Sequence, residues 1–524
     1  MARPYLVGAC VLGLAVVGCS AGGPEGTSSL ALPDEALPTV TASVLTPVLH
    51  GYDDAPRAPD SDDTAIWVNP KKRGEGLVIG ALKNAGLQVY DLSGHVLQTI
   101  IPPSRPAVSA EDPPPPGPRP EPGTGPCPDS ASGEVFGRFN NVDVQYGVEI
   151  KSHGKTKRID VAVVTDRGCD RLRVYSIDPS RASSPLVEIT APDAPRAFPR
   201  RFEQPSPFQS PGEHSQTVEN DLDDQSTAYG VTLYRPEHRG HELRAFVTQR
   251  RRAVVGEFVF FPKGDGLLSY RMLREYRFDP VFAIPSTKPH RKALDWTPCR
   301  EDPAEDPQFE GLTVDQERGV LYAAQEVVGV WRIPLKDSWP AVVNVPASRL
   351  IEPTYSFGAE YFAVPHGDEF SCEDEAPAEP VVGTVAVAGN PSVGGEFLAA
   401  DVEGLAIYYR ANKRGYLIVS SQGDDTFHVF DRAHPTDHLT AFKFEGVGET
   451  DGHDVVNVPV GAAFPFGLFT VQNGKAPPPA SEDEIDSYEY DNSTQFEFVG
   501  WEDVASTLGL TVDENSYDPR HPHD

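Results

Sequence analysis

The chain has 524 residues, of which 77 are Asp or Glu and 45 are Lys or Arg, so its formal net charge is −32 at pH 7. This charge would repel a phosphate backbone and no Lys/Arg-rich stripe offsets it, which excludes nucleic acid as the expected partner. The 46 Gly and 52 Pro residues disfavour long helices and favour short strands joined by turns, in one large or two ordinary domains.

The first 19 residues have the pattern of an export signal. Arg3 supplies a positive start, and the apolar run that follows is too short to span a bilayer. The sequence Val-Val-Gly-Cys at residues 16–19 is typical of a bacterial lipoprotein cleavage box and predicts that Cys19 carries the lipid anchor; a plain secretory signal is the alternative. Both predict an exported protein, either lipid-anchored to the cell envelope or secreted. Residues 20–45 are then expected to be a flexible linker to a domain over residues 46–524.

Four cysteines remain after the signal and the lipidated residue are set aside. They are Cys127, Cys169, Cys299 and Cys372, an even number in an oxidising compartment, so two disulfides are expected. Their spacing matches no zinc pattern. Four cysteines allow three pairings, which the sequence leaves open; pairing of chain neighbours, Cys127 with Cys169 and Cys299 with Cys372, is favoured.

One local pattern occurs six times along the chain: a run of strand formers, a short polar or glycine-containing turn, and a second run. The pairs are 78–82 with 87–92, 159–165 with 172–177, 243–248 with 256–261, 319–324 with 329–333, 415–420 with 426–430, and 466–471 with 495–500. Their spacing leaves room each time for a four-stranded sheet and its loops. The sequence therefore predicts an all-β fold, a six-bladed β-propeller, with a pair of β-sandwiches as the alternative. The Pro-rich or polar segments 102–135, 190–226 and 476–493 are expected to be inserted loops.

Polar residues follow the first strand of every pair. They are Lys83-Asn84, Asp166-Arg167, Gln249-Arg250, Gln325-Glu326, Gln422-Gly423-Asp424 and Gln472-Asn473. If equivalent strands of the blades end on one face, these side chains form a ring of cations, carboxylates and amides at one end of the central channel. A solvated rim of turn residues is the alternative.

No motif for a covalent nucleophile, a zinc helix or a phosphate-binding loop is present, but carboxylates gather at the edges of the expected strands. They are Asp62, Asp63, Glu310, Glu326, Asp401, Glu403 and Asp451. Asp401 and Glu403 alternate along a strand, so both are expected on the same face. Hard oxygen ligands of this kind favour Ca²⁺ over zinc, although for each residue an exposed loop carboxylate is the alternative.

Three cations, Lys83, Arg167 and Arg250, occupy corresponding positions in the pattern, and Tyr229 lies in a nearby strand. Calcium held by the carboxylates would turn this region into a positive pocket in a negative protein, which suits a polyphosphorylated substrate. Bridging metal ions can activate a water for phosphate-ester hydrolysis without a protein nucleophile.

Several motifs together resemble the β-propeller phytases, in family order over about residues 46–510. They include 62–67 (DDTAIW), 138–143 (RFNNVD), 228–234 (AYGVTLY), 309–311 (FEG), 321–326 (LYAAQE), 401–409 (DVEGLAIYY) and 464–469 (FPFGLF). The resemblance implies a calcium-dependent phytase of the 3-phytase type, which removes phosphates from phytate, myo-inositol hexakisphosphate. In that family one phosphate occupies a cleavage site over bridging Ca²⁺ ions and a neighbouring phosphate occupies an affinity site.

The resemblance also implies a role for each matched residue. Asp62, Asp63, Glu310, Glu326, Asp401, Glu403 and Asp451 would hold catalytic calcium; Lys83, Arg167, Tyr229 and Arg250 would bind phosphate; Asn141, Gln472 and Asn473 would belong to a calcium site that supports the fold. The sequence departs from the family pattern at Lys475, where an acid is common, and in the shortened segment 450–453 (TDGH). The run Arg250-Arg251-Arg252 leaves the register of its phosphate-binding arginine open.

Two other functions fit the same residues. One is a non-catalytic, surface-anchored calcium-binding propeller for phosphorylated or acidic ligands. The other is a calcium-dependent propeller hydrolase for lactones or other phosphoesters. The three cations beside the acidic set favour the phytase, with calcium-phytate as a small-molecule substrate, and a monomer is expected.

Overall fold

The computed structural model describes residues 37–52, 58–103, 127, 136–202, 217–219, 222, 225–236, 242–300, 302, 305–367, 369–480, 490–514 and 518–520. All of them belong to one compact unit, Glu35–Asp524. The expected export signal, Cys19 and most of segment 102–135 lie outside the described residues. Within the described ranges, no helix has the length and apolar character needed to cross a membrane.

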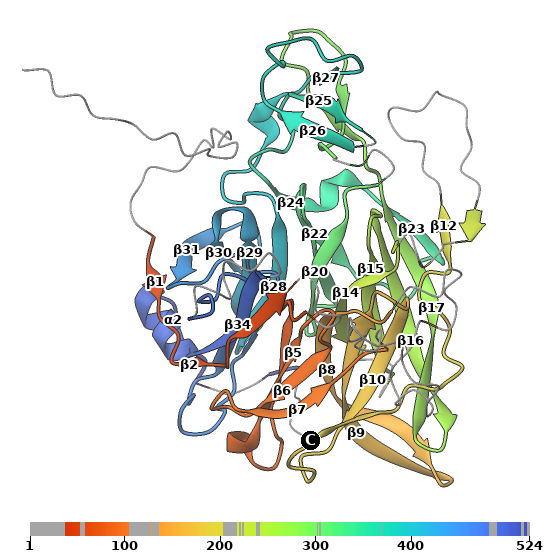
Figure 1. Cartoon of the computed structure of the whole chain (residues 1–524), viewed down its shortest axis with the longest axis vertical. Coiled ribbons are helices and arrows are strands. Elements are labelled where there is room, and N and C mark those ends of the chain that lie inside the picture. Colours follow the sequence, from red (N-terminus) through yellow and green to blue (C-terminus); the bar gives the residue numbers. More distant parts are fainter. Residues whose placement is uncertain are drawn as a thin grey trace, which may run out of the picture. The chain divides into compact units, whose positions relative to one another are not determined.

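Six sheets of four or five strands follow one another along the described chain (Figure 1). The first contains β4 (Thr64–Trp67), β5 (Leu77–Ala81), β6 (Leu87–Tyr90) and β7 (Val96–Ile100). The second contains β8 (Phe139–Ser152), β9 (Lys155–Asp166), β10 (Arg171–Ile177) and β11 (Leu186–Glu188). The third contains β14 (Ala228–Tyr234), β15 (Arg244–Gln249), β16 (Val254–Gly264) and β17 (Leu267–Phe278), with β23 (Val342–Val345) added in parallel.

The other three sheets repeat this order. The fourth contains β20 (Phe309–Asp315), β21 (Val320–Gln325), β22 (Gly329–Pro334) and β24 (Leu350–Pro353). The fifth contains β28 (Val402–Arg410), β29 (Arg414–Ser421), β30 (Thr426–Asp431) and β31 (His438–Phe444), with β1 (Thr39–Val40) in parallel. The sixth contains β32 (His453–Val456), β33 (Leu468–Asn473) and β34 (Tyr490–Gly500), and β2 (Val44–Leu45) and β3 (Leu49–Tyr52) both pair with β34.

The first strands of the six sheets form a closed ring. β4 contacts β8, and the contacts continue through β14, β20, β28 and β32 back to β4. This arrangement confirms the predicted six-bladed propeller, and the six predicted strand pairs are the second and third strands of the blades. The N-terminal strands β1–β3 close the ring by joining the last two blades. β1 and β2 lie within residues 20–45, so the sheets begin earlier in the chain than the linker boundary expected at residue 45.

The hydrophobic core lies between neighbouring blades. Along β9, Val161 and Val163 pack in a cluster with strands of the third blade, whereas the alternating residues Ala162 and Val164 pack in a cluster with the first blade. Successive strand residues point to opposite faces, so each blade buries both of its faces. This explains why the strands are continuous apolar runs rather than alternating polar and apolar ones.

Short elements extend from the blades. They are the pairs β12 (Arg200–Phe202) with β13 (Thr217–Glu219) and β18 (Phe282–Ile284) with β19 (Leu294–Trp296), the sheet of β25 (Tyr361–His366), β26 (Glu369–Glu373) and β27 (Val385–Val387), the helix α2 (Trp501–Leu508), and 3-10 helices at Arg73–Glu75, Ala347–Arg349, Pro391–Val393 and Gln422–Asp424. β12 and β13 therefore lie within segment 190–226, which was expected to be a loop. The favoured disulfides, Cys127–Cys169 and Cys299–Cys372, are both formed.

Candidate active site

The residues predicted to form the site all lie at one edge of the blades. In an antiparallel sheet the first strand starts where the second strand ends. Asp62, Asp63, Asn141, Tyr229, Glu310, Asp401, Glu403 and Asp451 lie at or just before the start of a first strand, and Lys83, Arg167, Arg250, Glu326, Gln472 and Asn473 lie at the end of a second strand. The ring of first strands thus brings together segments that are far apart in the sequence.

Glycines allow neighbouring strand starts to pack closely. Tyr229, Glu310 and Glu403 each precede a glycine, at a shift in the pairing register near the start of β14, β20 and β28. A Cβ atom on Gly230 would collide with the carbonyl oxygen of Glu310, and one on Gly311 would collide with that of Glu403. Each bulge adds one residue to its strand, and glycine lets the neighbouring backbones meet. Tyr229, Glu310 and Glu403 are therefore neighbours across three blades.

Three glutamates form a compact acidic group. One carboxylate oxygen from each of Glu310, Glu326 and Glu403 lies within 4.8 Å of the other two. Burial and then repulsion from Glu310 and Glu326 raise the pKa of Glu403 well above its usual value, and the pKa values of Glu310 and Glu326 are raised for the same two kinds of reason. Gln308 donates hydrogen bonds to both carboxylate oxygens of Glu326, at 2.9 and 3.0 Å. Lys83 and Arg167 act to lower the pKa of Glu310, and Arg250 acts to lower that of Glu326, but burial and repulsion among the carboxylates outweigh these cations.

Asp401 adds to this acidic group. It directly precedes β28, and its charge contributes to the raised pKa values of Glu326 and Glu403. The backbone carbonyl of Asp401 accepts a hydrogen bond of 2.8 Å from the backbone N–H of Gln422. Asp401 and Glu403 therefore lie close enough to repel each other, but the register shift after Val402 means that simple alternation along the strand does not decide which face each side chain takes.

A second acidic group surrounds Lys83. Its ammonium nitrogen lies 3.3 Å from Asp62, 3.3 Å from Asp451 and 2.9 Å from Asp60. Asp62 is 1% exposed, and burial is the main cause that raises its pKa well above the usual value. Gln422 donates a hydrogen bond to the Asp451 carboxylate. Lys83 therefore balances only part of the charge of three aspartates.

Asp63 points to a different place from its neighbour Asp62. Its carboxylate accepts a 3.1 Å hydrogen bond from the backbone N–H of Val142, and it lines the cavity inside the ring together with Asp143 and Asp454. Burial raises the pKa of Asp63 well above its usual value. The two adjacent aspartates thus contribute to separate regions, Asp62 beside Lys83 and Asp63 inside the channel.

A group of basic residues faces the glutamates. Arg167 is 7% exposed, its guanidinium carbon lies 5.4 Å from the centre of the Tyr229 ring, and it donates a 2.9 Å hydrogen bond to the side chain of Asn140. The Asn140 amide donates in turn to Glu310, at 2.6 Å. The Nε and Nη1 atoms of Arg250 are buried without a hydrogen-bond partner. Arginine N–H groups without a hydrogen-bond partner thus lie near the buried carboxylates of the acidic group.

The three amides assigned to a structural calcium site are engaged in hydrogen bonds. Asn141 accepts a 2.9 Å hydrogen bond from Asn140, and Gln472 accepts one of 2.8 Å from the backbone N–H of Asp451. The side-chain oxygen of Asn473 accepts from the backbone N–H groups of Gly448 and Lys475. These contacts connect the blade edges directly through protein groups.

The acidic residues fit a hard divalent cation. One carboxylate oxygen of Glu403 and one of Asp62 are buried and have no hydrogen-bond partner. A buried, unpartnered carboxylate oxygen beside like charges is costly for the protein alone, and a bound cation would remove that cost. The donor set is made of carboxylate oxygens, which Ca²⁺ prefers and zinc does not require.

Sequence reasoning gave no role to four residues that the structure places in the site: Asp60, Arg138, Asn140 and Gln308. Arg138 and Asn140 lie within a motif that carried the family resemblance, and Gln308 directly precedes Phe309-Glu310. The motif was therefore the available signal, but the residue types alone do not say which of two adjacent asparagines reaches Glu310.

Comparisons with known proteins find similarity to phytases. The family described as Phytase matches residues 364–524. The curated 3-phytase of Bacillus subtilis (strain 168) is 26% identical over 485 residues, which is 90% of this chain and 86% of that protein. Among solved structures, Saccharomyces cerevisiae Sqt1 has a TM-score of 0.34 with 10% identity, covering 88% of this chain and 99% of that one. The β-propeller domain of Cps50 (Swd1) from Myceliophteria thermophila has a TM-score of 0.28 with 9% identity, covering 87% and 99%.

Proposed function

We infer that this chain, which belongs to the β-propeller phytase family, is a phytase that hydrolyses phosphate esters of phytate. The observation that carries the inference is the division of charge in the site. Buried carboxylates with raised pKa values make up one part of the site, and arginines with N–H groups that have no hydrogen-bond partner make up the other. A polyphosphorylated ring carrying divalent cations complements both sides.

We propose Ca²⁺ as the cation, with several ions bound. Glu310, Glu326, Asp401 and Glu403 would hold calcium in one group, Asp62 and Asp451 would hold it beside Lys83, and Asp63 would hold it in the channel. When bound, calcium neutralises phosphate oxygens and makes a coordinated water more acidic, which supports hydrolysis without a protein nucleophile. Asn141, Gln472 and Asn473 are proposed to support the fold beside a further calcium site.

The basic residues are proposed to bind and orient phosphate. Arg167 is held by Asn140 and lies against the Tyr229 ring, so its guanidinium has a fixed direction before substrate arrives. Arg250 offers two buried N–H groups without protein partners. Lys83 would exchange part of its aspartate contacts for phosphate. These residues would hold one phosphate at the acidic group and a second phosphate on the arginine side.

The test is phosphate release from phytate by the full mature protein. We expect EDTA to abolish release, added Ca²⁺ to restore it, and Glu310→Gln to lower kcat by at least about 100-fold. Glu379→Gln, at an exposed residue, is the matched control and should stay within about twofold of the wild type. If the wild-type protein binds phytate but releases no phosphate at any calcium concentration, the non-catalytic binding protein is the correct function.

Localisation is proposed from the sequence and the disulfides together. The two disulfides and the similarity to a 3-phytase support export. We propose that residues 1–19 are a signal, that Cys19 carries a lipid anchor, that residues 20–38 form the tether before β1, and that the propeller is a monomer. Loss of labelled-lipid incorporation in Cys19→Ala would support the anchor, and light scattering of the soluble domain would measure its mass.

A further inference from the structure

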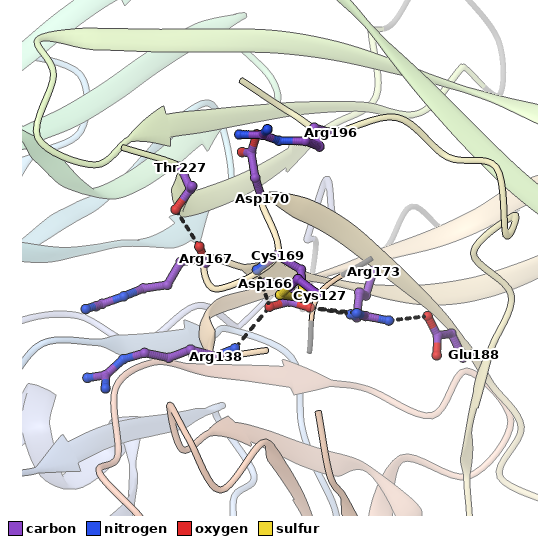
Figure 2. Close-up of a disulfide and its surroundings, with 10 residues drawn as sticks. All are labelled: Cys127, Arg138, Asp166, Arg167, Cys169, Asp170, Arg173, Glu188, Arg196 and Thr227. Carbon is purple, nitrogen blue, oxygen red and sulfur yellow. Dashed lines mark hydrogen bonds and ion pairs between the residues drawn. A yellow bond between two sulfur atoms is a disulfide. The ribbon is translucent and has the colours of Figure 1, made fainter. Parts of the chain in front are cut away.

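Arg138 lies next to Arg167, although the family resemblance assigned it no role. Arg138 directly precedes β8 and Arg167 directly follows β9, and the backbone N–H of Arg167 donates a 2.8 Å hydrogen bond to the carbonyl of Arg138. Figure 2 shows the two side chains extending in the same direction, away from the Cys127–Cys169 disulfide. Two guanidinium groups are therefore presented together at the edge of the second blade.

The backbone at both arginines is held by a buried aspartate. The Asp166 carboxylate is 0% exposed and accepts hydrogen bonds from the backbone N–H groups of Arg138, at 3.0 Å, and Cys169, at 3.1 Å. Its other oxygen lies 2.7 Å from two nitrogens of Arg173 (Figure 2). Arg173 thus already neutralises Asp166, so this aspartate fixes the positions of Arg138 and Arg167 without serving as the counterion of their side chains.

The charges of the arginine pair are only partly balanced by other protein groups. Arg138 donates to the side-chain oxygen of Asn84, at 3.3 Å, and lies 3.7 Å from Asp60, which is nearer to Lys83. Arg167 donates to Asn140, a neutral partner. The Nε atoms of both arginines are buried and have no hydrogen-bond partner. Like charges held side by side with unused donors favour binding of an anion.

We propose that Arg138 is a further substrate-binding residue, which together with Arg167 binds one phosphate group of the substrate. Two guanidinium groups can each direct a pair of N–H donors at phosphate oxygens, which a lysine cannot do. Asp60, whose side chain is 34% exposed, then serves as the counterion of Arg138 and Lys83 before substrate binds. This proposal rests on the proposed function, because it names a residue for the same substrate.

The experiment compares Arg138→Gln, Arg138→Lys and Asp60→Asn with the wild-type protein in calcium-containing buffer. Calorimetry measures binding of myo-inositol hexasulfate, a non-hydrolysable polyanion, and phosphate release from phytate gives KM and kcat. Arg158→Gln is the control, since this arginine of β9 has a 53% exposed side chain and its Nε lies 3.6 Å from Glu149 of the same blade. Thermal unfolding of each variant checks that it is folded.

We expect Arg138→Gln to weaken hexasulfate binding and raise KM by about 10-fold or more, with kcat changed by less than about threefold, because a charged hydrogen-bonding partner is lost. Arg138→Lys should recover only part of this loss. Asp60→Asn should tighten binding by about two- to fivefold, because it removes a competing anion. The control should match the wild type.

Each outcome decides the proposal. If Arg138→Gln binds hexasulfate within twofold of the wild type, Arg138 does not bind substrate; should that variant fail to fold, unchanged or weaker binding by Asp60→Asn refutes the proposal instead. If the wild type binds hexasulfate through Arg138 but releases no phosphate from phytate, the binding role stands and the proposed phytase activity fails.

Discussion

The acidic group of Glu310, Glu326 and Glu403 makes a prediction in which the effect of one substitution changes sign with calcium. Replacement of Glu403 by Gln keeps the shape of the side chain and removes one of three charges. At the 4.8 Å limit of their oxygen separations, two carboxylates repel by about 3.5 kcal/mol at an effective dielectric constant of about 20. Glu403 takes part in two such pairs. If protonation of one neighbouring glutamate has already removed one repulsion, Glu403→Gln still removes the other, which is about 3 kcal/mol.

Without calcium, Glu403→Gln is therefore expected to be more stable than the wild type. For a domain of this size, 1 kcal/mol shifts Tm by roughly 1 °C, so Tm in EDTA at about pH 8 should rise by about 3 °C. The pKa of Glu403 is raised in the folded protein, so folding of the wild type favours the protonated group, and that stability is lost as pH rises through the folded pKa. The difference between variant and wild type should accordingly shrink towards zero near pH 5.

With calcium the order should reverse, because the wild type gains stability from ion binding and the variant has lost a ligand. The assay is calorimetric unfolding of both proteins, with EDTA and with excess Ca²⁺, alongside Glu379→Gln as an exposed control. A lower Tm for Glu403→Gln than for the wild type in EDTA would refute the repulsion. An equal calcium-induced gain in Tm for both proteins would refute the role of Glu403 as a ligand.

Three other perturbations test the physical description of the fold. Burial raises the pKa of Glu352 to about 7 from its usual 4.5, so the stability that its protonated form contributes is lost as pH rises through about 7. Glu352→Gln should therefore raise the free energy of unfolding by about 2 kcal/mol at pH 9 and leave it unchanged near pH 4, as urea titration at both pH values would measure. Replacing both Cys127 and Cys169 by serine opens a loop with a sequence separation of 42 and should lower the free energy of unfolding by up to about 4 kcal/mol. The KM for phytate should rise as well, because Cys169 lies two residues from Arg167. No change in KM would mean that the disulfide does not position this turn. Arg432→Met removes the side chain that donates hydrogen bonds of 2.6 and 2.8 Å to Asp315, a residue that is 0% exposed, and leaves that carboxylate with the more distant Arg318, at 3.5 Å. The free energy of unfolding should fall by about 3 kcal/mol and recover in part when Asp315→Asn is added, as a double-mutant cycle would measure.

Much of the fold could be predicted from the sequence because its signal is local. Runs such as 159–165 and 172–177 are strands in any all-β protein, since β-branched residues joined by a tight turn favour a hairpin wherever both faces can be buried. Six such units at similar spacing predict a propeller, and the structure has the expected strands in each blade. The cysteines were less informative: three pairings fitted the sequence, and only the fold brings Cys127 beside Cys169.

The candidate site depended more on tertiary structure. Side chains alternate along a regular strand, so counting residues predicts which of them share a face. The register shifts after Phe139, Phe309 and Val402 break this count where the site residues lie, because a bulge adds one residue to a strand. Sequence alone therefore could not tell that Asn140 reaches Glu310.

The sequence by itself determined the strands, the carboxylates and cations at their ends, and the excess of negative charge. Only the tertiary structure decided that Asp62 faces Lys83 whereas Asp63 faces the channel, and that Arg138 lies beside Arg167. The reason is that hydrophobic patterning acts within a strand, whereas the direction of a charged side chain depends on neighbours supplied by other blades and distant parts of the chain.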